Sequence, residues 1–262
     1  MTSESMMSTE FWRNGPSPGS VYNFPGPGQT AMQNQSQIGA AKRTLAPTVT
    51  GTSVLGIKFN GGVVIAADML GSYGLSARYR NLSRVMKVND STIIGCGGDY
   101  ADFQYLQSVI EQRVIDEECL NDGLATHQRG LYSWMTRILY NRRSQFNPLW
   151  NVFLVGGLQD GEPFLGFVDK IGVADESPTI CTGYGAYIAN PLLREAYENN
   201  PNMTLEEAQK QIERCMKILY YRDARSINKY EVAIVTKDGC IVKPPVQPET
   251  NWEIAHLIKG YE

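Results

Sequence analysis

The sequence has little of what metal sites and imidazole-based enzymes are built from. It contains only two histidines, His127 and His256, and five cysteines with no CxxC spacing. Tetrahedral zinc sites and disulfide scaffolds need ligands or partners that lie closer together along the chain. We therefore expect no metal and no cofactor, and we expect the cysteines to be reduced and mostly buried. Hydrolytic chemistry in this chain would have to operate without imidazole.

Long apolar runs and an excess of positive charge are also missing. No run approaches the roughly 18 apolar residues that a membrane span needs, and the polar N-terminus lacks the apolar region of a signal peptide. The net charge of -3 argues against a surface for nucleic acid or anionic membranes. These absences predict a soluble intracellular protein that binds neither nucleic acid nor membranes.

Residues 1–43 differ in composition from the rest of the chain. They are rich in Gly, Pro, Ser, Gln and Asn and show no periodicity. Such a segment buries too little apolar surface to offset its ordering entropy, so we expect it to be disordered. The composition changes at Lys42-Arg43, which marks either the end of a removable leader or the root of an uncleaved tail.

Beyond residue 44, hydrophobic periodicity predicts blocks of strands separated by pairs of helices. The expected strands cover residues 52–59, 63–67, 84–88, 91–95, 150–158, 163–168, 178–182, 230–236 and 240–243. The expected helices cover 100–120, 126–144, 187–198 and a final one through 221, which a capping box from Thr204 to Glu207 opens. This order favours the α+β class, with a helix pair on each side of two stacked sheets, over a doubly wound sheet.

The pattern of residues from Thr50 to Leu70 predicts a buried β-hairpin with a candidate catalytic residue near each end. If the chain were cut after Gly51, Thr52 would carry a hydroxyl nucleophile and a free amine with a pKa near 8 that can act as its base. Asp68 ends the second strand, where its carboxylate could point back toward Thr52. The alternative is that Gly51-Thr52 simply begins a strand and that Asp68 is a solvent-facing residue at a strand end.

Four motifs carry a resemblance to a known family. The segments GTSVLGIKFNGGVVIAAD, GCGGDYADFQ, TGYGA and YYRDARS resemble the β-type subunits of the 20S proteasome, and the resemblance extends over residues 44–243. It implies the four-layer αββα sandwich of N-terminal-nucleophile hydrolases. It also implies α and β proteasome subunits as partners in a hetero-oligomeric 28-subunit barrel of stacked rings. That complex degrades ubiquitinated proteins in the cytoplasm and nucleus.

The resemblance also assigns the positions that are catalytic in active members of the family. They fall on Thr52, Asp68, Arg84, Tyr184, Asp223 and Ser226. Two of them have changed, because Arg84 stands for a lysine and Tyr184 for a serine. Arginine stays charged and cannot exchange a proton with a hydroxyl as a buried lysine can. We expect the Tyr184 ring to fill the space that a peptide carbonyl must enter, and the other positions to hold strand ends together by hydrogen bonds.

Processing implied by the resemblance leads to the same conclusion. In the subgroup that this chain most resembles, the leader is cut between positions that match Arg43 and Thr44, so Thr52 would keep an amide nitrogen. We expect a non-catalytic subunit that stabilises the β ring and the contact between the two β rings. The alternatives are an active threonine endopeptidase with Thr52 as nucleophile and a free-standing N-terminal-nucleophile amidase.

The C-terminal segment, residues 244–262, is too apolar for a solvated tail. Its apolar side chains are Trp252, Ile254, Leu257 and Ile258. We expect it to dock on a neighbouring subunit with Trp252 as an anchor. The alternative is that it packs on its own domain.

Overall fold

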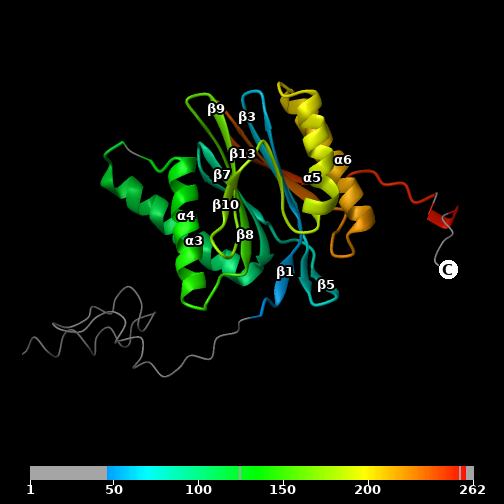
Figure 1. Ribbon diagram of the computed structural model, residues 1–262, viewed down its shortest axis with the longest axis horizontal. Helices are drawn as coiled ribbons and strands as arrows, with labels where there is room; N and C mark the ends of the chain where they lie inside the picture. Colours follow the sequence, from blue (N-terminus) through cyan, green and yellow to red (C-terminus); the bar gives the residue numbers. More distant parts are fainter. Residues whose placement is uncertain (1–45, 124, 254, 258–262) are drawn as a thin grey trace, which may run out of the picture. The chain divides into compact units, whose positions relative to one another are not determined.

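Two antiparallel sheets lie face to face between two pairs of helices (Figure 1). The structure is a computed structural model that describes residues 46–123, 125–253 and 255–257. All of these residues belong to one unit, residues 45–262. The arrangement is the four-layer αββα sandwich that the resemblance implied, and it confirms the α+β class.

The first sheet has eight strands. Seven follow the order β10 (Ala174–Glu176), β9 (Glu162–Val168), β8 (Asn151–Gln159), β7 (Thr92–Asp99), β1 (Val49–Gly51), β4 (Gly71–Tyr73) and β5 (Ser76–Tyr79). The eighth, β6 (Val85–Asn89), pairs with the first part of β7, while β1 pairs with its last two residues. The two strands therefore share one edge of β7.

The second sheet has five strands. Their order is β11 (Thr179–Cys181), β2 (Val54–Phe59), β3 (Gly62–Asp68), β12 (Tyr230–Thr236) and β13 (Gly239–Val246). Every residue of β3 is buried, because β3 is the central strand of a sheet that is covered on both faces. Gly61 takes a φ of +100° in the turn from β2 to β3, a conformation that favours glycine. The predicted buried hairpin is confirmed.

Four helices cover the outer faces of the sheets. The helices α3 (Tyr100–Leu120) and α4 (Gln128–Ser144) pack on the first sheet, and α5 (Gly185–Asn199) and α6 (Leu205–Arg222) pack on the second. Thr204 and Glu207 form both hydrogen bonds of the predicted capping box. A short 3-10 helix, η1 (Ala255–Leu257), follows near the C-terminus.

The hydrophobic core has three layers. One lies between the two sheets and contains Val54, Ile65 and Leu154. The second lies between the first sheet and α3 and α4, and the third between the second sheet and α5 and α6. The β2–β3 hairpin contributes side chains to two of these layers, so its ends are held firmly at the edge of the sandwich.

The structure corrects several of the predicted boundaries. Strands β1, β4, β5 and β10 were not predicted, and β7 continues to Asp99. Strand β13 extends to Val246, through Pro244 and Pro245. Prolines are tolerated there because β13 is an edge strand whose pairing register shifts opposite them. No helix in the described ranges is long and apolar enough to cross a membrane.

Candidate active site

The residues before Thr52 form a strand inside the first sheet. Thr50 lies opposite Ser72 of β4 on one side and opposite Asp99 of β7 on the other. The main-chain N–H of Thr48 donates to Asp99 Oδ1 at 2.9 Å, which fixes the entry to this strand. Thr52 follows β1 directly, so its nitrogen is a peptide amide in the folded chain. An amide nitrogen has no basic lone pair and cannot take the proton of the hydroxyl.

Arg84 is buried beside Thr52, with 2% of its surface exposed. Its Nε donates to the main-chain oxygen of Asp68 at 2.9 Å, and its two terminal nitrogens donate to the main-chain oxygens of Thr52, Ser53 and Cys96 at 2.8, 3.0 and 3.2 Å. A fifth hydrogen bond forms an ion pair with Asp68 Oδ1. A guanidinium has five N–H donors, so all of them are used. Arg84 therefore joins the link between β1 and β2 to β3 and β7, and it has no donor left for the Thr52 hydroxyl.

Gly51 is fitted to this arginine. A Cβ at Gly51 would lie 2.4 Å from Arg84 Cδ and 2.9 Å from its Nε. Only a glycine leaves room for the guanidinium stem at this point of β1. The Gly-Thr dipeptide is thus adapted to Arg84 packing against it.

The Asp68 carboxylate is turned toward Arg84 and away from solvent. It is 1% exposed, and its Oδ2 accepts from the main-chain N–H of Ile227 at 3.3 Å. Burial raises the pKa of Asp68, while the Arg84 charge and the Ile227 N–H oppose that shift. No hydrogen bond joins Asp68 to Thr52 in the described part of the chain. Arg84 contacts both, so the expected direct approach of the two residues is replaced by an arginine bridge.

The Thr52 hydroxyl instead donates to Asp223 Oδ2 at 2.6 Å. Asp223 caps the C-terminal end of α6, and its Oδ1 accepts from the N–H of Arg225 at 2.9 Å. Ser226 donates to the main-chain oxygens of Leu219 and Asp223, and therefore finishes the helix and does not reach Thr52. A carboxylate is a far weaker base than an amine, so this arrangement holds the hydroxyl more than it activates it. The Thr52–Asp223 pair spans 171 residues, and no local sequence signal reveals it.

Tyr184 does not fill the cleft next to Thr52, contrary to the expectation. That cleft has a volume of about 310 Å³ and is lined by Thr50, Gly51, Thr52, Gly97, Gly98, Val152, Thr182, Gly183 and Arg225. Tyr184 is 51% exposed, and its ring lies 6.5 Å from that of Tyr187. Tyr184 is the N-cap residue of α5, and its side chain is not part of the cleft lining. It is β1, and not a phenol ring, that occupies the slot between β4 and β7.

Comparison with known proteins identifies the family to which this chain belongs. Residues 48–235 match the family of proteasome subunits. This chain belongs to the proteasome subunit family. It is 57% identical to "Proteasome subunit beta type-4" of Xenopus laevis over 95% of this chain and 98% of that protein. It is 43% identical to the Drosophila melanogaster protein of the same name, over 97% of each chain, and 40% identical to "Proteasome subunit beta type-7" of Saccharomyces cerevisiae, over 83% of this chain and 86% of that protein.

The structure describes some of the other predicted residues of this proteasome subunit and not others. Arg43, Thr44, Ile254 and Ile258 fall outside the described residues. The Trp252 ring is half exposed and makes edge contacts with Tyr220 and Tyr221 of its own α6, with ring centroids 5.7 and 4.8 Å apart. Leu257 is 67% exposed. Among the described residues, no group of three His, Cys, Asp or Glu side chains is placed to hold a metal ion.

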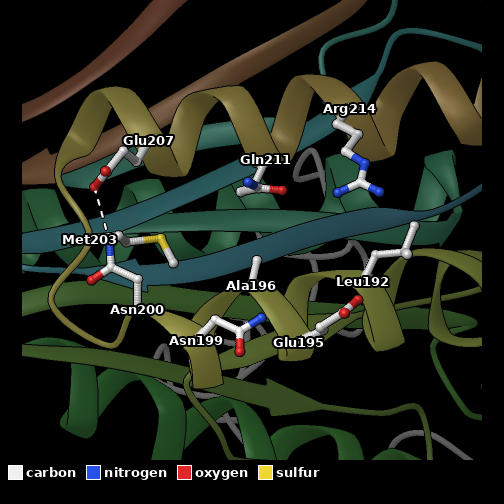
Figure 2. A pocket seen from close by; sticks show the side chains of 9 residues that line it. All are labelled: Leu192, Glu195, Ala196, Asn199, Asn200, Met203, Glu207, Gln211 and Arg214. Carbon is white, nitrogen blue, oxygen red and sulfur yellow. Dashed lines mark hydrogen bonds between the residues drawn. The ribbon is translucent and has the colours of Figure 1, made fainter.

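A second concavity of this proteasome subunit lies between α5 and α6 (Figure 2). It has a volume of about 360 Å³, and its walls carry Glu195 and Asn199 of α5 opposite Gln211 and Arg214 of α6. A hydrogen bond of 3.3 Å from Asn200 to Glu207 closes one end (Figure 2). The groove holds no nucleophile next to a base. Its lining is mostly polar.

Proposed function

We propose that this chain is a non-catalytic structural β subunit of the proteasome core particle. The observation that carries the proposal is the position of β1. The segment before Thr52 is hydrogen-bonded to strands on both sides, and Thr50 and Gly51 form part of the wall of the cleft beside Thr52. A β1 segment that is paired on both sides favours a chain in which Gly51 stays attached to Thr52.

The chemistry around Thr52 supports the same conclusion. Nucleophilic catalysis by threonine needs a base close to the hydroxyl. While Gly51 stays attached, the nitrogen of Thr52 is an amide; all five donors of Arg84 are engaged, and the hydroxyl is held by Asp223 at 2.6 Å. The role that remains for these side chains is to hold the ends of β1, β2 and β3 together.

In this proposal the subunit assembles with α and β proteasome subunits in a 28-subunit barrel, in the cytoplasm and nucleus. Residues 1–43 are a leader that is cut between Arg43 and Thr44, and residues 44–243 form the domain proper. The groove between α5 and α6 and the tail around Trp252 are the surfaces available for neighbours, since both present polar or aromatic groups to solvent. The stabilised contacts are those within the β ring and between the two β rings.

The deciding experiment is the intact mass of this chain in purified core particles. A mature chain that begins at Thr44 is the expected result, and a chain that begins at Thr52 would overturn the proposal. An electrophilic peptide probe provides an independent test, with the threonine-active subunits of the same particles as the positive control. We expect no covalent adduct on residue 52.

The second candidate is an active threonine endopeptidase. The 2.6 Å contact between Thr52 and Asp223 is the observation in its favour, because a carboxylate next to a hydroxyl can accept its proton. This candidate requires cleavage after Gly51 and the departure of β1 from the sheet. Adduct formation on Thr52 in particles that contain the cleaved chain would establish it.

A further inference from the structure

A larger and more apolar pocket adjoins the Thr52 cleft on the side of β8 and β11. It has a volume of about 440 Å³, which is within the range of ligand-sized pockets. It is lined by Pro47, Thr50, Gly98, Trp150, Val152, Phe167, Asp169, Lys170, Cys181, Thr182, Gly183 and Ala186. We call it the Trp150 pocket. Five of these residues also line the Thr52 cleft, so the two concavities are continuous along β1.

One cation stands over this pocket without an anionic partner. Lys170 Nζ lies 3.7 Å from the centroid of the Trp150 ring, a cation–π contact. Lys170 forms no ion pair with any residue in the described ranges. The Trp150 indole Nε1 is buried and has no hydrogen-bond acceptor among those residues. A buried donor without an acceptor is costly, but Nε1 is enclosed, so it is the positive charge of Lys170 that the pocket offers to an incoming group.

Neither of the other ionisable side chains that line the pocket, Asp169 and Cys181, forms an ion pair with Lys170. Asp169 Oδ1 accepts from the main-chain N–H groups of Ile171 and Val173, both at 2.9 Å, so it is committed to its own turn. Burial raises the pKa of the Cys181 thiol, which keeps it neutral. The walls are otherwise apolar, with Phe167 and Val152 facing the space beside Trp150. The pocket therefore matches a carboxylate that is attached to an apolar body.

We propose that the Trp150 pocket receives an aspartate or glutamate side chain, flanked by an apolar residue, from a neighbouring subunit of the core particle. The carboxylate accepts a hydrogen bond from Lys170 Nζ, and the apolar residue packs on Phe167. Pro47 and Thr50 form part of the wall, so the pocket exists only while the segment before Thr52 is retained. In the proposed mature chain, which begins at Thr44, Pro47 and Thr50 always line the pocket. A lining that is always present suits a subunit that stays bound better than a substrate peptide that binds and leaves. The inference rests on the proposed function, because it requires the chain to be in an assembled particle.

A zero-length carbodiimide cross-linker tests the contact in intact particles that contain this chain. The reagent activates a carboxylate, and a lysine amine in direct contact displaces the activating group to form an amide with loss of water overall. Mass spectrometry of the digest should show Lys170 joined to an aspartate or glutamate of a neighbouring subunit. A Lys170 joined to the C-terminus of a free peptide, or no Lys170 cross-link, would overturn the proposal.

Two substitutions of Lys170 and one control substitution distinguish loss of the proposed contact from a failure of the chain to fold. Lys170→Arg should keep its place in the particle but lose the cross-link, because a guanidinium is not acylated under these conditions. Lys170→Glu should lower incorporation about tenfold, since it opposes a carboxylate with a second one. The matched control, Lys237→Glu in the exposed β12–β13 turn, should incorporate normally. Normal incorporation of Lys170→Glu would contradict the inference alone, whereas absence of the unmodified chain from particles would contradict the proposed function.

Discussion

At the residue scale, the decisive feature is the buried Arg84 beside Thr52, where a catalytic threonine would need a group that can exchange a proton with its hydroxyl. Arg84 cannot release a proton near neutral pH, and its planar fork is filled by four carbonyl oxygens and one carboxylate oxygen. A lysine in the same place would offer three donors on a flexible stem. The exchange therefore converts a position suited to proton transfer into one that fixes the main chain.

The first prediction concerns Arg84→Lys. At least two of the five acceptors lose their donor, so the free energy of unfolding should fall by about 2–4 kcal/mol. The N-terminus of the chain in particles should stay the same, so that its mass falls only by the difference between arginine and lysine, because β1 still fills its slot. Denaturant unfolding of the isolated chain and intact-mass measurement check the two parts. Arg80→Lys is the control, since the exposed Arg80 makes one hydrogen bond, to Ala77, and should change stability by less than about 0.5 kcal/mol.

The cysteines give a second prediction at this scale. Burial raises the pKa of Cys240 to about 11 and of Cys215 to about 12, and it also raises those of Cys96 and Cys181. Only the thiolate reacts with alkylating reagents, so at pH about 8 the exposed Cys119 should be the one labelled in the folded chain. Mass spectrometry of the alkylated protein, before and after unfolding, checks this. Fast labelling of Cys215 in the native protein would contradict it.

These thiols also set the sign of a pH effect. The folded chain keeps the Cys240 proton above the ordinary pKa of 9.0, while the unfolded chain releases it. Between pH 9 and about 11 the folded state therefore binds more protons, and the free energy of unfolding falls as the pH rises. The stabilisation from this residue is fully present below pH 9 and is lost as the pH passes through the folded value.

At the scale of elements, β1 shows what the sequence could and could not predict. Its three residues, Val49–Gly51, are too few for any periodicity, and β4 and β10 are as short. The β2–β3 hairpin and the capping box at Thr204 were predicted because their signals lie within a few neighbouring residues. The path of β13 through Pro244 and Pro245 was not, since only its place at the sheet edge makes those prolines tolerable.

The same reasoning applies to the candidate site. Motif resemblance placed Arg84 beside Thr52, and in the structure Arg84 contacts both Thr52 and Asp68 although it precedes β6 of the first sheet and Asp68 ends β3 of the second. The hydrogen bond from Thr52 to Asp223 depends on where α6 ends relative to β2, which is a property of the whole sandwich. The prediction that the Tyr184 ring fills the cleft was wrong, because the ring lies beside that of Tyr187 of α5 and does not line the cleft.

Gly51→Ala tests the fit between β1 and Arg84. The new methyl group would lie 2.4 Å from Arg84 Cδ, and Arg84 can retreat only by giving up hydrogen bonds. We expect a loss of about 1–3 kcal/mol in the free energy of unfolding. Gly130→Ala in α4 is the control. Its nearest neighbour would be Thr126 Cγ2 at 3.3 Å, and alanine favours a helix, so stability should stay level or rise by up to about 1 kcal/mol. Equal effects of the two substitutions would argue against this fit.

At the scale of the whole molecule, the C-terminal tail connects the stability of the domain to its assembly. Asn228 Nδ2 donates to the main-chain oxygen of Pro248 at 3.0 Å, and Tyr221 Oη accepts from the N–H of Asn251 at 2.7 Å. Trp252 then lies against α6 with half of its surface open. The tail is thus held on its own domain at its root, while an aromatic face remains for a neighbour.

Trp252→Ala and deletion of residues 247–262 separate these two roles. Aromatic pairs contribute about 0.5–1.5 kcal/mol each, so Trp252→Ala should lower the free energy of unfolding of the isolated chain by about 1–2 kcal/mol. If the exposed face docks on a neighbour, incorporation into particles should fall more steeply than this loss of stability explains, since a buried tryptophan anchor at an interface is worth about 2 kcal/mol or more. Unfolding curves and the fraction of chain found in particles measure the two effects. Normal assembly of the deleted chain would show that the tail serves its own domain alone.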